Sequence, residues 1–264
     1  MDIEKLNLIK KDILKELLCN QKPSDEFCGL YVDGTGKLTF DMADAAFWSF
    51  KVFSEHIYPI YLFVASNNNE EEIKKIVNKY QNTKVYCIPP LRNYLEYNSW
   101  MMNYPWFLID TKHENILTFQ DDSAVISKGW EDYFLSGNWD YIGSPWRSDI
   151  VVLTKDGPSK TLRVGNGGHS ARKRKSIIEV VDYINKRGGQ HNYFTGIKIN
   201  GETKQQNSWL AEDAMIVSAG TISNLLKLPT EEEARKFGHE PIEFDLYMDK
   251  SNPMRPYVIH KVDM

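Results

Sequence analysis

Short apolar runs alternate with amphipathic segments along the first half of the chain. The apolar runs predict a buried strand at 60–65 and strands at 84–88 and 116–120, and the apolar run 27–32 is followed by a turn at 33–36. Helical spacing predicts helices at 41–54, 70–80 and, continuous or broken, at 94–109. This alternation predicts an α/β fold, with a mixed, mainly parallel sheet flanked by helices on both faces. Such sheets bind ligands beyond the carboxyl ends of strands, so we expect chemistry at Asp121 and Asp122.

The second half of the chain is less regular. It predicts a strand at 140–143, a hairpin or loop at 151–158, and a strand at 162–165 before a glycine-rich turn. Three further helices are expected, at 170–186, 211–218 and 230–237. The polar stretch 187–208 is rich in Gly, Asn and Gln, and this composition is typical of a mobile active-site loop.

Residues 1–20 have the pattern of an amphipathic helix, with Ile3, Leu6, Ile9, Ile13 and Leu17 on one stripe. We favour a helix that docks on its own domain, and peripheral contact with an anionic membrane is the alternative. A length of 264 residues, of which 42% are hydrophobic, predicts a single globular domain spanning 1–264.

Composition excludes several classes of protein. No apolar run reaches the ~20 residues of a membrane-spanning helix, and no signal-peptide cleavage pattern is seen, so we predict a cytoplasmic protein. A net charge of -4 argues against nucleic-acid binding. The three cysteines, Cys19, Cys28 and Cys87, are odd in number and unevenly spaced, and imply neither a disulfide framework nor a zinc site. A basic cluster at 172–175 is interpreted as a solvated first helical turn, with phosphate contact as the less favoured alternative.

Two adjacent carboxylates, Asp121 and Asp122, follow the strand predicted at 116–120. Such groups repel each other in a partly buried cleft unless a cation lies beside them. Mg²⁺ or Mn²⁺ binds one or two protein carboxylates and completes its shell with phosphate oxygens and water, which suits a departing nucleotide. A second interpretation is equally open at this point, in which Asp122 or Ser123 caps a following helix.

Two other segments offer groups for a ligand. In 165–172, three glycines around Asn166 permit positive φ and close approach of backbone N–H groups, although a structural turn is the commoner explanation. Glu212 and Asp213 begin a predicted helix beside Trp209. A carboxylate there is able to accept the proton of a hydroxyl. Stabilisation of the helix N-terminus, worth under about 1 kcal/mol, explains the same residues without chemistry.

His260 lies in a short strand-like tail at 256–262. Imidazole binds metals at neutral pH, and although it suits Mn²⁺ less well than oxygen donors do, it discriminates against Mg²⁺ and Ca²⁺. Most single histidines are not ligands, so a metal-binding role depends on which groups lie near His260.

In this order, the motifs resemble those of glycosyltransferases of the GT-A (Rossmann-like) fold. Specifically, they resemble a family of bacterial and viral glycosyltransferases described as a domain of unknown function. The resemblance runs from about residue 80 onward. The matching stretches are Tyr97-Asn98, 116–123, 139–146, 165–172, Glu212-Asp213, Leu228-Pro229-Thr230 with Ala234 and Phe237, and 259–261.

The resemblance implies roles on the donor side. Asp122 corresponds to the last residue of the Asp-x-Asp motif that holds Mn²⁺ or Mg²⁺ against the donor diphosphate. Gln120 stands at the first position of that motif and Asp121 at the second, so metal binding is expected to rest on Asp122 with His260. The remaining donor-binding or substrate-binding candidates from the glycine-rich segment are Asn166, Gly167, Gly168 and Arg172.

The resemblance also implies roles on the acceptor side. Glu212 and Asp213 resemble the acidic pair from which inverting members take their catalytic base, and Asp213 is slightly favoured. Trp146 and Trp209 resemble walls of the acceptor site.

We therefore predict a hexosyltransferase-like enzyme of surface glycan biosynthesis. It would transfer a sugar from a nucleotide-diphosphate sugar to a hydroxyl of a glycan or glycolipid, with metal assistance and inversion of the anomeric centre. One alternative is a non-catalytic nucleotide-sugar or carbohydrate-binding module on a degenerate transferase scaffold, which Gln120 favours. The other is a metal-dependent phosphoesterase that uses the same Asp pair.

Overall fold

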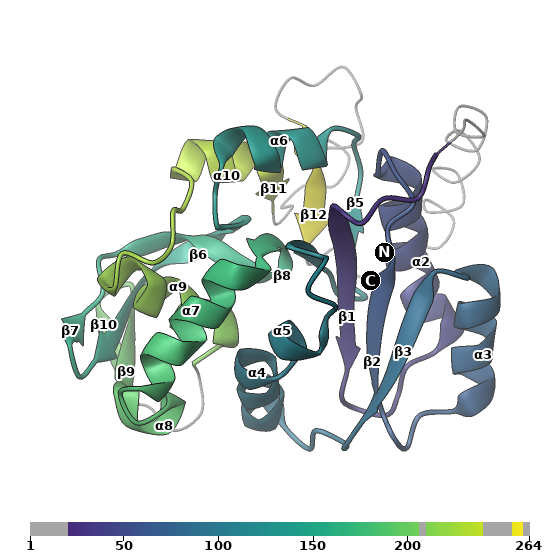
Figure 1. Ribbon diagram of the computed structural model, residues 1–264. Helices are drawn as coiled ribbons and strands as arrows, with labels where there is room; N and C mark the ends of the chain where they lie inside the picture. The colour runs from purple at the N-terminus through teal and green to yellow at the C-terminus, as the bar shows by residue number, and fades with distance from the viewer. Residues whose placement is uncertain (1–20, 206–209, 240–254, 261–264) are drawn as a thin grey trace.

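The computed structural model of the protein describes residues 21–205, 210–239 and 255–260. The amphipathic segment predicted at 1–20 and the predicted acceptor-site residue Trp209 lie outside this part of the chain. A large mixed sheet occupies the centre (Figure 1). Within the described residues it has nine strands, which follow the order β10-β9-β6-β8-β4-β1-β2-β3, with β7 paired to β6. The predicted α/β class, a mixed central sheet flanked by helices, is confirmed.

The parallel part of the sheet is built from the predicted apolar runs. Its strands are β1 (Phe27–Asp33), β2 (Ile60–Ala65), β3 (Thr83–Ile88) and β4 (Asn115–Thr118), and all neighbouring pairs among them are parallel. Every residue of β2 is buried. Such continuous burial is typical of a parallel strand that is covered on both faces.

Alternate side chains of these strands enter two hydrophobic cores, one on each face of the sheet. Phe27 and Leu62 enter the core that α2, α3 and α6 cover, whereas Leu30 and Phe63 enter the core that α4, α5, α7 and α9 cover. The helices are α2 (Phe40–Phe53), α3 (Glu70–Lys79), α4 (Tyr94–Asn103), α5 (Pro105–Leu108), α6 (Trp130–Gly137), α7 (Arg174–Asn185) and α9 (Glu212–Ile222). The predicted helix at 94–109 is broken before Pro105, whose ring nitrogen has no proton to donate. Among the described helices, none is both long and apolar enough to cross a membrane.

The antiparallel part of the sheet begins at β4 and contains the glycine-rich segment. Its strands are β6 (Tyr141–Thr154), β7 (Gly157–Pro158), β8 (Leu162–Lys173), β9 (Phe194–Ile199) and β10 (Glu202–Gln205). The predicted turn at 166–168 and helix start at 170 were wrong, because β8 runs through both and α7 begins only at Arg174. The strand persists because it pairs on both sides: Arg172 faces Ile116 of β4 and Tyr141 of β6.

The predicted mobile loop at 187–208 was also wrong over most of its length. This stretch contains α8 (Gln190–Tyr193) and the hairpin of β9 and β10. Asn200 and Gly201 have φ values of 49° and 85°. Positive φ at both central residues is the requirement of the tight turn that joins two antiparallel strands.

A second, smaller sheet lies beside α6 and α10 (Glu231–Phe237) (Figure 1). It has the order β11-β12-β5 within the described residues, and consists of β11 (Gly238–His239), β12 (Val258–His260) and β5 (Ser123–Val125). β12 is antiparallel to β5, and His260 lies opposite Ser123. This pairing brings the end of the described chain next to the segment that follows β4.

Candidate active site

The order of the parallel strands reverses between β1 and β4. The chain adds β2 and β3 on one side of β1 and then returns to place β4 on the other side. In open α/β sheets, ligands bind outside the carboxyl ends of the strands at such a reversal. Asp33 is the last residue of β1, and Gln120, Asp121 and Asp122 follow β4.

A cavity of about 320 Å³ lies at the end of β4. Its polar lining contains most of the predicted site residues: Gln120, Asp122, Asn166, Gly167, Gly168, Glu212, Asp213 and His260. Its apolar and aromatic lining includes Trp146, Tyr94, Tyr97, Ile150, Ile197 and Ile199. Two predicted residues, Asp121 and Arg172, are outside this lining.

Asp122 and His260 lie together although they are far apart in the sequence. Nε2 of His260 is 3.5 Å from Oδ1 of Asp122, and the His260 side chain is 4% exposed. No helix follows Asp122, because Ser123 begins β5. The hydroxyl of Ser123 instead accepts the N–H of Gln120 and donates to its carbonyl oxygen. The interpretation of Asp122 or Ser123 as a helix cap was therefore wrong.

Gly168 makes room for the imidazole of His260. A Cβ at this position would collide with the His260 ring. Glycine here is therefore needed for close approach, and a larger residue would push His260 away from Asp122. His169 is buried behind the pair, and burial together with the charge of His260 lowers the pKa of His169 to about 3.

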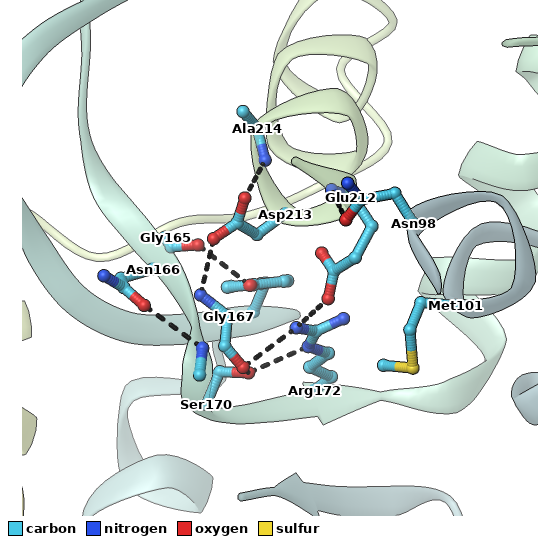
Figure 2. A network of polar contacts seen from close by, with 12 residues as sticks. Asn98, Met101, Gly165, Asn166, Gly167, Ser170, Arg172, Glu212, Asp213 and Ala214 are labelled. Carbon is cyan, nitrogen blue, oxygen red and sulfur yellow. Dashed lines mark hydrogen bonds and ion pairs between the residues drawn. The ribbon is translucent and has the colours of Figure 1, made fainter. Parts of the chain in front are cut away.

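Asp213 is held at the cavity wall by two backbone groups (Figure 2). Its Oδ2 accepts the N–H of Gly167 at 2.7 Å, and its Oδ1 accepts the N–H of Ala214 at 2.6 Å. Burial raises the pKa of Asp213, while these two N–H groups and the charge of Arg172 oppose the rise. A carboxyl group with a raised pKa in a cavity is suited to proton transfer near neutral pH.

Glu212 is paired with a buried guanidinium. Nη2 of Arg172 donates to Oε1 of Glu212 at 2.9 Å, and the Arg172 side chain is 0% exposed (Figure 2). The guanidinium lies over the rings of Trp106 and Tyr141, at 5.1 Å and 4.7 Å from their centroids. Burial raises the pKa of Glu212 and the charge of Arg172 opposes that rise. The interpretation of residue 172 as part of a solvated helical turn was wrong, because this residue belongs to β8.

Helix α4 completes the cavity with three polar side chains. Oδ1 of Asn98 accepts the N–H of Glu212 at 3.1 Å, and so caps α9, which has no side-chain cap at its own N-terminal residue. Nε2 of Gln120 donates to the hydroxyl of Tyr97 at 3.3 Å. Tyr94 also lines the cavity, and it is 52% exposed. Tyr94 was missed by the sequence analysis, whereas the resemblance had pointed to 97–98.

The groups at the Asp122 corner fit a divalent metal that is shared with a ligand. Oδ1 of Asp122 is buried and accepts no hydrogen bond from the described residues. One carboxylate and one imidazole suit Mn²⁺, which accepts both oxygen and nitrogen donors. No cluster of three His, Cys, Asp or Glu side chains suited to a metal occurs in the described chain. A metal at this corner would therefore take its remaining ligands from phosphate oxygens and water.

The structure thus describes an α/β protein with an acidic cavity at the reversal point of its sheet. Residues 82–260 match the sequence profile of the family described as "Protein of unknown function (DUF5672)". This match spans more than half of the chain, and the protein belongs to that family.

The solved structures that are similar to this chain include two enzymes. One is mouse xyloside xylosyltransferase 1 in its apo form, with 8% identity, 89% of this chain and 96% of that chain covered, and a TM-score of 0.48. The other is 4-diphosphocytidyl-2C-methyl-D-erythritolsynthase from Anaerococcus prevotii, with 10% identity, 76% and 100% covered, and a TM-score of 0.40. A search of curated proteins finds no match.

Proposed function

We propose that this protein is a glycosyltransferase that moves a sugar from a nucleotide-diphosphate sugar to an acceptor hydroxyl and inverts the anomeric centre. One observation carries the proposal: Asp122, His260 and Asp213 converge on one cavity at the reversal point of the sheet. The first two form a pair suited to a metal, and the third is a buried carboxyl group with a raised pKa. The proposed setting, surface glycan synthesis, rests on the resemblance described above.

On the donor side, Asp122 and His260 would hold Mn²⁺ or Mg²⁺, with Mn²⁺ preferred because one ligand is an imidazole. When bound, the ion would neutralise the charge that develops on the departing nucleoside diphosphate. Gln120 and Asn166 offer neutral side chains to the donor from the same cavity. Asp121 is outside the lining, and its pKa is raised by burial, by Asp122 and by Asp33 at the end of β1. A contact between Asp121 and the donor therefore rests on the resemblance alone.

On the acceptor side, we assign the base to Asp213. Oε1 of Glu212 is bonded to the buried guanidinium of Arg172, which stabilises the charged carboxylate and makes it a weaker base, although its Oε2 has no hydrogen-bond partner within the described residues. Each oxygen of Asp213 accepts only one backbone N–H and keeps a lone pair for another donor. The carboxylate would take the proton of the acceptor hydroxyl as that oxygen bonds to the anomeric carbon. The bond from this carbon to the diphosphate breaks in the same step, and its electron pair leaves with the nucleotide. Arg172 is then a positioning residue for Glu212 rather than a donor contact.

The proposal is tested with Asp213→Asn and Asp122→Asn, using Asp156→Asn as the control. Asp156 is paired with Arg187 in an exposed site outside the cavity. Sugar transfer from a panel of UDP-, GDP- and dTDP-sugars with Mn²⁺ should fall at least about 100-fold in each site variant, because each loses an essential group. The control should keep full activity.

Full transfer activity in both site variants would refute the assignment. Two other results would support the alternative functions instead. Nucleotide-sugar binding with neither transfer nor donor hydrolysis would identify a binding module. Release of phosphate from simple phosphate esters, dependent on Asp122, would identify a phosphoesterase.

A further inference from the structure

A continuous aliphatic surface lines part of the cavity, on the strands of the antiparallel part of the sheet. Ile150 of β6 and Ile199 of β9 are direct partners across the two strands. Ile197 is two residues from Ile199 and therefore lies on the same face of β9. All three line the cavity. We call them the isoleucine wall.

Trp146 extends this wall toward the carboxylates. A Cβ at Gly165 would lie 3.0 Å from the Trp146 ring, so the indole packs directly on the backbone of β8 there. Gly165 has a φ of 125°, a conformation that favours glycine. Two residues further along the same strand, Gly167 donates its N–H to Asp213. The apolar wall and the assigned base are therefore joined by a short piece of one strand.

The charge of the cavity restricts what enters it. Asp122, Glu212 and Asp213 all line it, and within the described residues no Lys or Arg does. The guanidinium nearest to these carboxylates, that of Arg172, is buried against Glu212. A ligand that brings its own phosphate or carboxylate to the Asp213 side would be repelled unless a cation came with it.

We propose that the acceptor is a neutral amphiphile: a sugar or other hydroxyl-bearing group attached to an alkyl or aryl moiety that packs on the isoleucine wall and Trp146. Naming this ligand an acceptor rests on the proposed function, whereas binding of the apolar group to the wall does not. The hydroxyl would face Asp213 and the apolar moiety would leave along β6 and β9. A small soluble saccharide without such a moiety would bind less tightly, because the half-buried side chains of Ile199 and Trp146 would stay in contact with water.

The probes are octyl and methyl β-glycosides of glucose, galactose and N-acetylglucosamine, used below the micelle concentration and without metal. Isothermal titration should give dissociation constants at least about tenfold lower for octyl than for methyl glycosides, as expected when two methylenes are buried. Octyl phosphate should bind more weakly than the best octyl glycoside. The same protein is titrated separately with nucleoside diphosphates and Mn²⁺.

Ile199→Thr tests the wall directly, with Val151→Thr as the matched control. Both changes put a β-branched polar residue into a strand, but Val151 follows Ile150 on β6, points to the other face and does not line the cavity. The octyl preference should fall about fivefold or more in Ile199→Thr and stay unchanged in Val151→Thr.

Equal affinities for octyl and methyl glycosides across the whole panel would overturn the inference, as would tighter binding of octyl phosphate or an equal loss in the two variants. If nucleotide and Mn²⁺ still bind after such a result, the proposed transferase function stands and only the inference about the acceptor fails. If the octyl preference holds and depends on Ile199 but no nucleotide binds, the wall stands and the transferase function fails.

Discussion

Replacing Arg172 with Met should reduce the free energy of unfolding by about 3–5 kcal/mol at pH 8, the cost of leaving one member of a buried ion pair alone. The structure favours the full effect. The side chains of Arg172 and Glu212 are 0% and 7% exposed and are joined by a bond of 2.9 Å, so little solvent is available to replace the guanidinium. Met fills the space against Trp106 and Tyr141, which limits any contribution from a cavity.

The loss should depend on pH in a defined direction. Burial already raises the pKa of Glu212, and removing Arg172 removes a charge that opposes this rise. When the pKa of a carboxyl group is higher in the folded state than its unfolded value of 4.5, its contribution to stability is fully present below pH 4.5. This contribution is lost as the pH rises through the folded pKa. Arg172→Met should therefore be closest to the wild type near pH 5 and furthest from it at pH 8.

Urea unfolding at pH 5, 6.5 and 8 measures the effect, and a double-mutant cycle with Glu212→Gln isolates the pair. The double variant should recover about 2–3 kcal/mol relative to the sum of the single changes. Arg187→Met is the control, because its pair with Asp156 is 37% exposed on each side and its loss should change stability far less than the loss of Arg172. A loss below about 1 kcal/mol for Arg172→Met, or a loss that does not change with pH, would refute the reasoning.

Two further changes test other parts of the structure. Burial raises the pKa of Glu131 to about 7, so ionisation of this carboxyl group destabilises the fold as the pH rises from 4.5 through 7. Glu131→Gln removes this cost and should raise the free energy of unfolding by about 1–2 kcal/mol at pH 8.5 and by almost nothing at pH 4.5. Urea unfolding at the two pH values measures the difference. Gly168→Ala should displace His260 and weaken Mn²⁺-dependent nucleotide binding at least about tenfold by titration, because the new Cβ collides with the imidazole.

Each of these two changes has a clear contrary result. A variant Glu131→Gln that is less stable than the wild type at pH 8.5 would mean that the bond from the Glu55 N–H to Glu131 outweighs the cost of its buried charge. For Gly168→Ala the control is Gly201→Ala, where a Cβ meets no atom within 4 Å but the φ of 85° still strains the backbone. Equal loss of binding in both glycine variants would show that destabilisation, not His260, is responsible.

The parallel part of the fold was predictable because its signals are local. An uninterrupted apolar run of six residues such as 60–65 is typical of a strand covered on both faces, and the observed β2 has the same bounds. The antiparallel part was not predicted as well. The glycines at 165–168 are a turn signal in any local window, and only pairing to β4 and β6 holds them extended.

The hairpin of β9 and β10 was missed although a signal was present. Asn200-Gly201 follows a strand with alternating apolar residues, which is a strong hairpin pattern. The polar composition of the surrounding stretch was given more weight than this dipeptide. The isoleucine wall was missed for the same reason. Ile197 and Ile199 can be assigned to one face of the sheet only when their segment is recognised as a strand.

The residues of the candidate site could be predicted from the sequence, but the role of each residue could not. Sequence order and resemblance placed Asp122, His260, Glu212 and Asp213 in one site, and the structure brings all four to one cavity. Arg172 could not be assigned from the sequence, because whether an arginine faces solvent or a buried carboxylate depends on strand pairing far from it.

The position of β12 determines when the site can form during synthesis. Asp122 leaves the ribosome early, with the large sheet still incomplete, whereas its neighbour His260 is added long after the strands β6, β8, β9 and β10. A nascent chain that has already assembled most of its cores would still lack one of the two groups at the Asp122 corner. If the proposed metal site is real, the ability to bind the ion would therefore arise late in translation, and a proteolytic cut that releases β12 while the rest stays folded would abolish it.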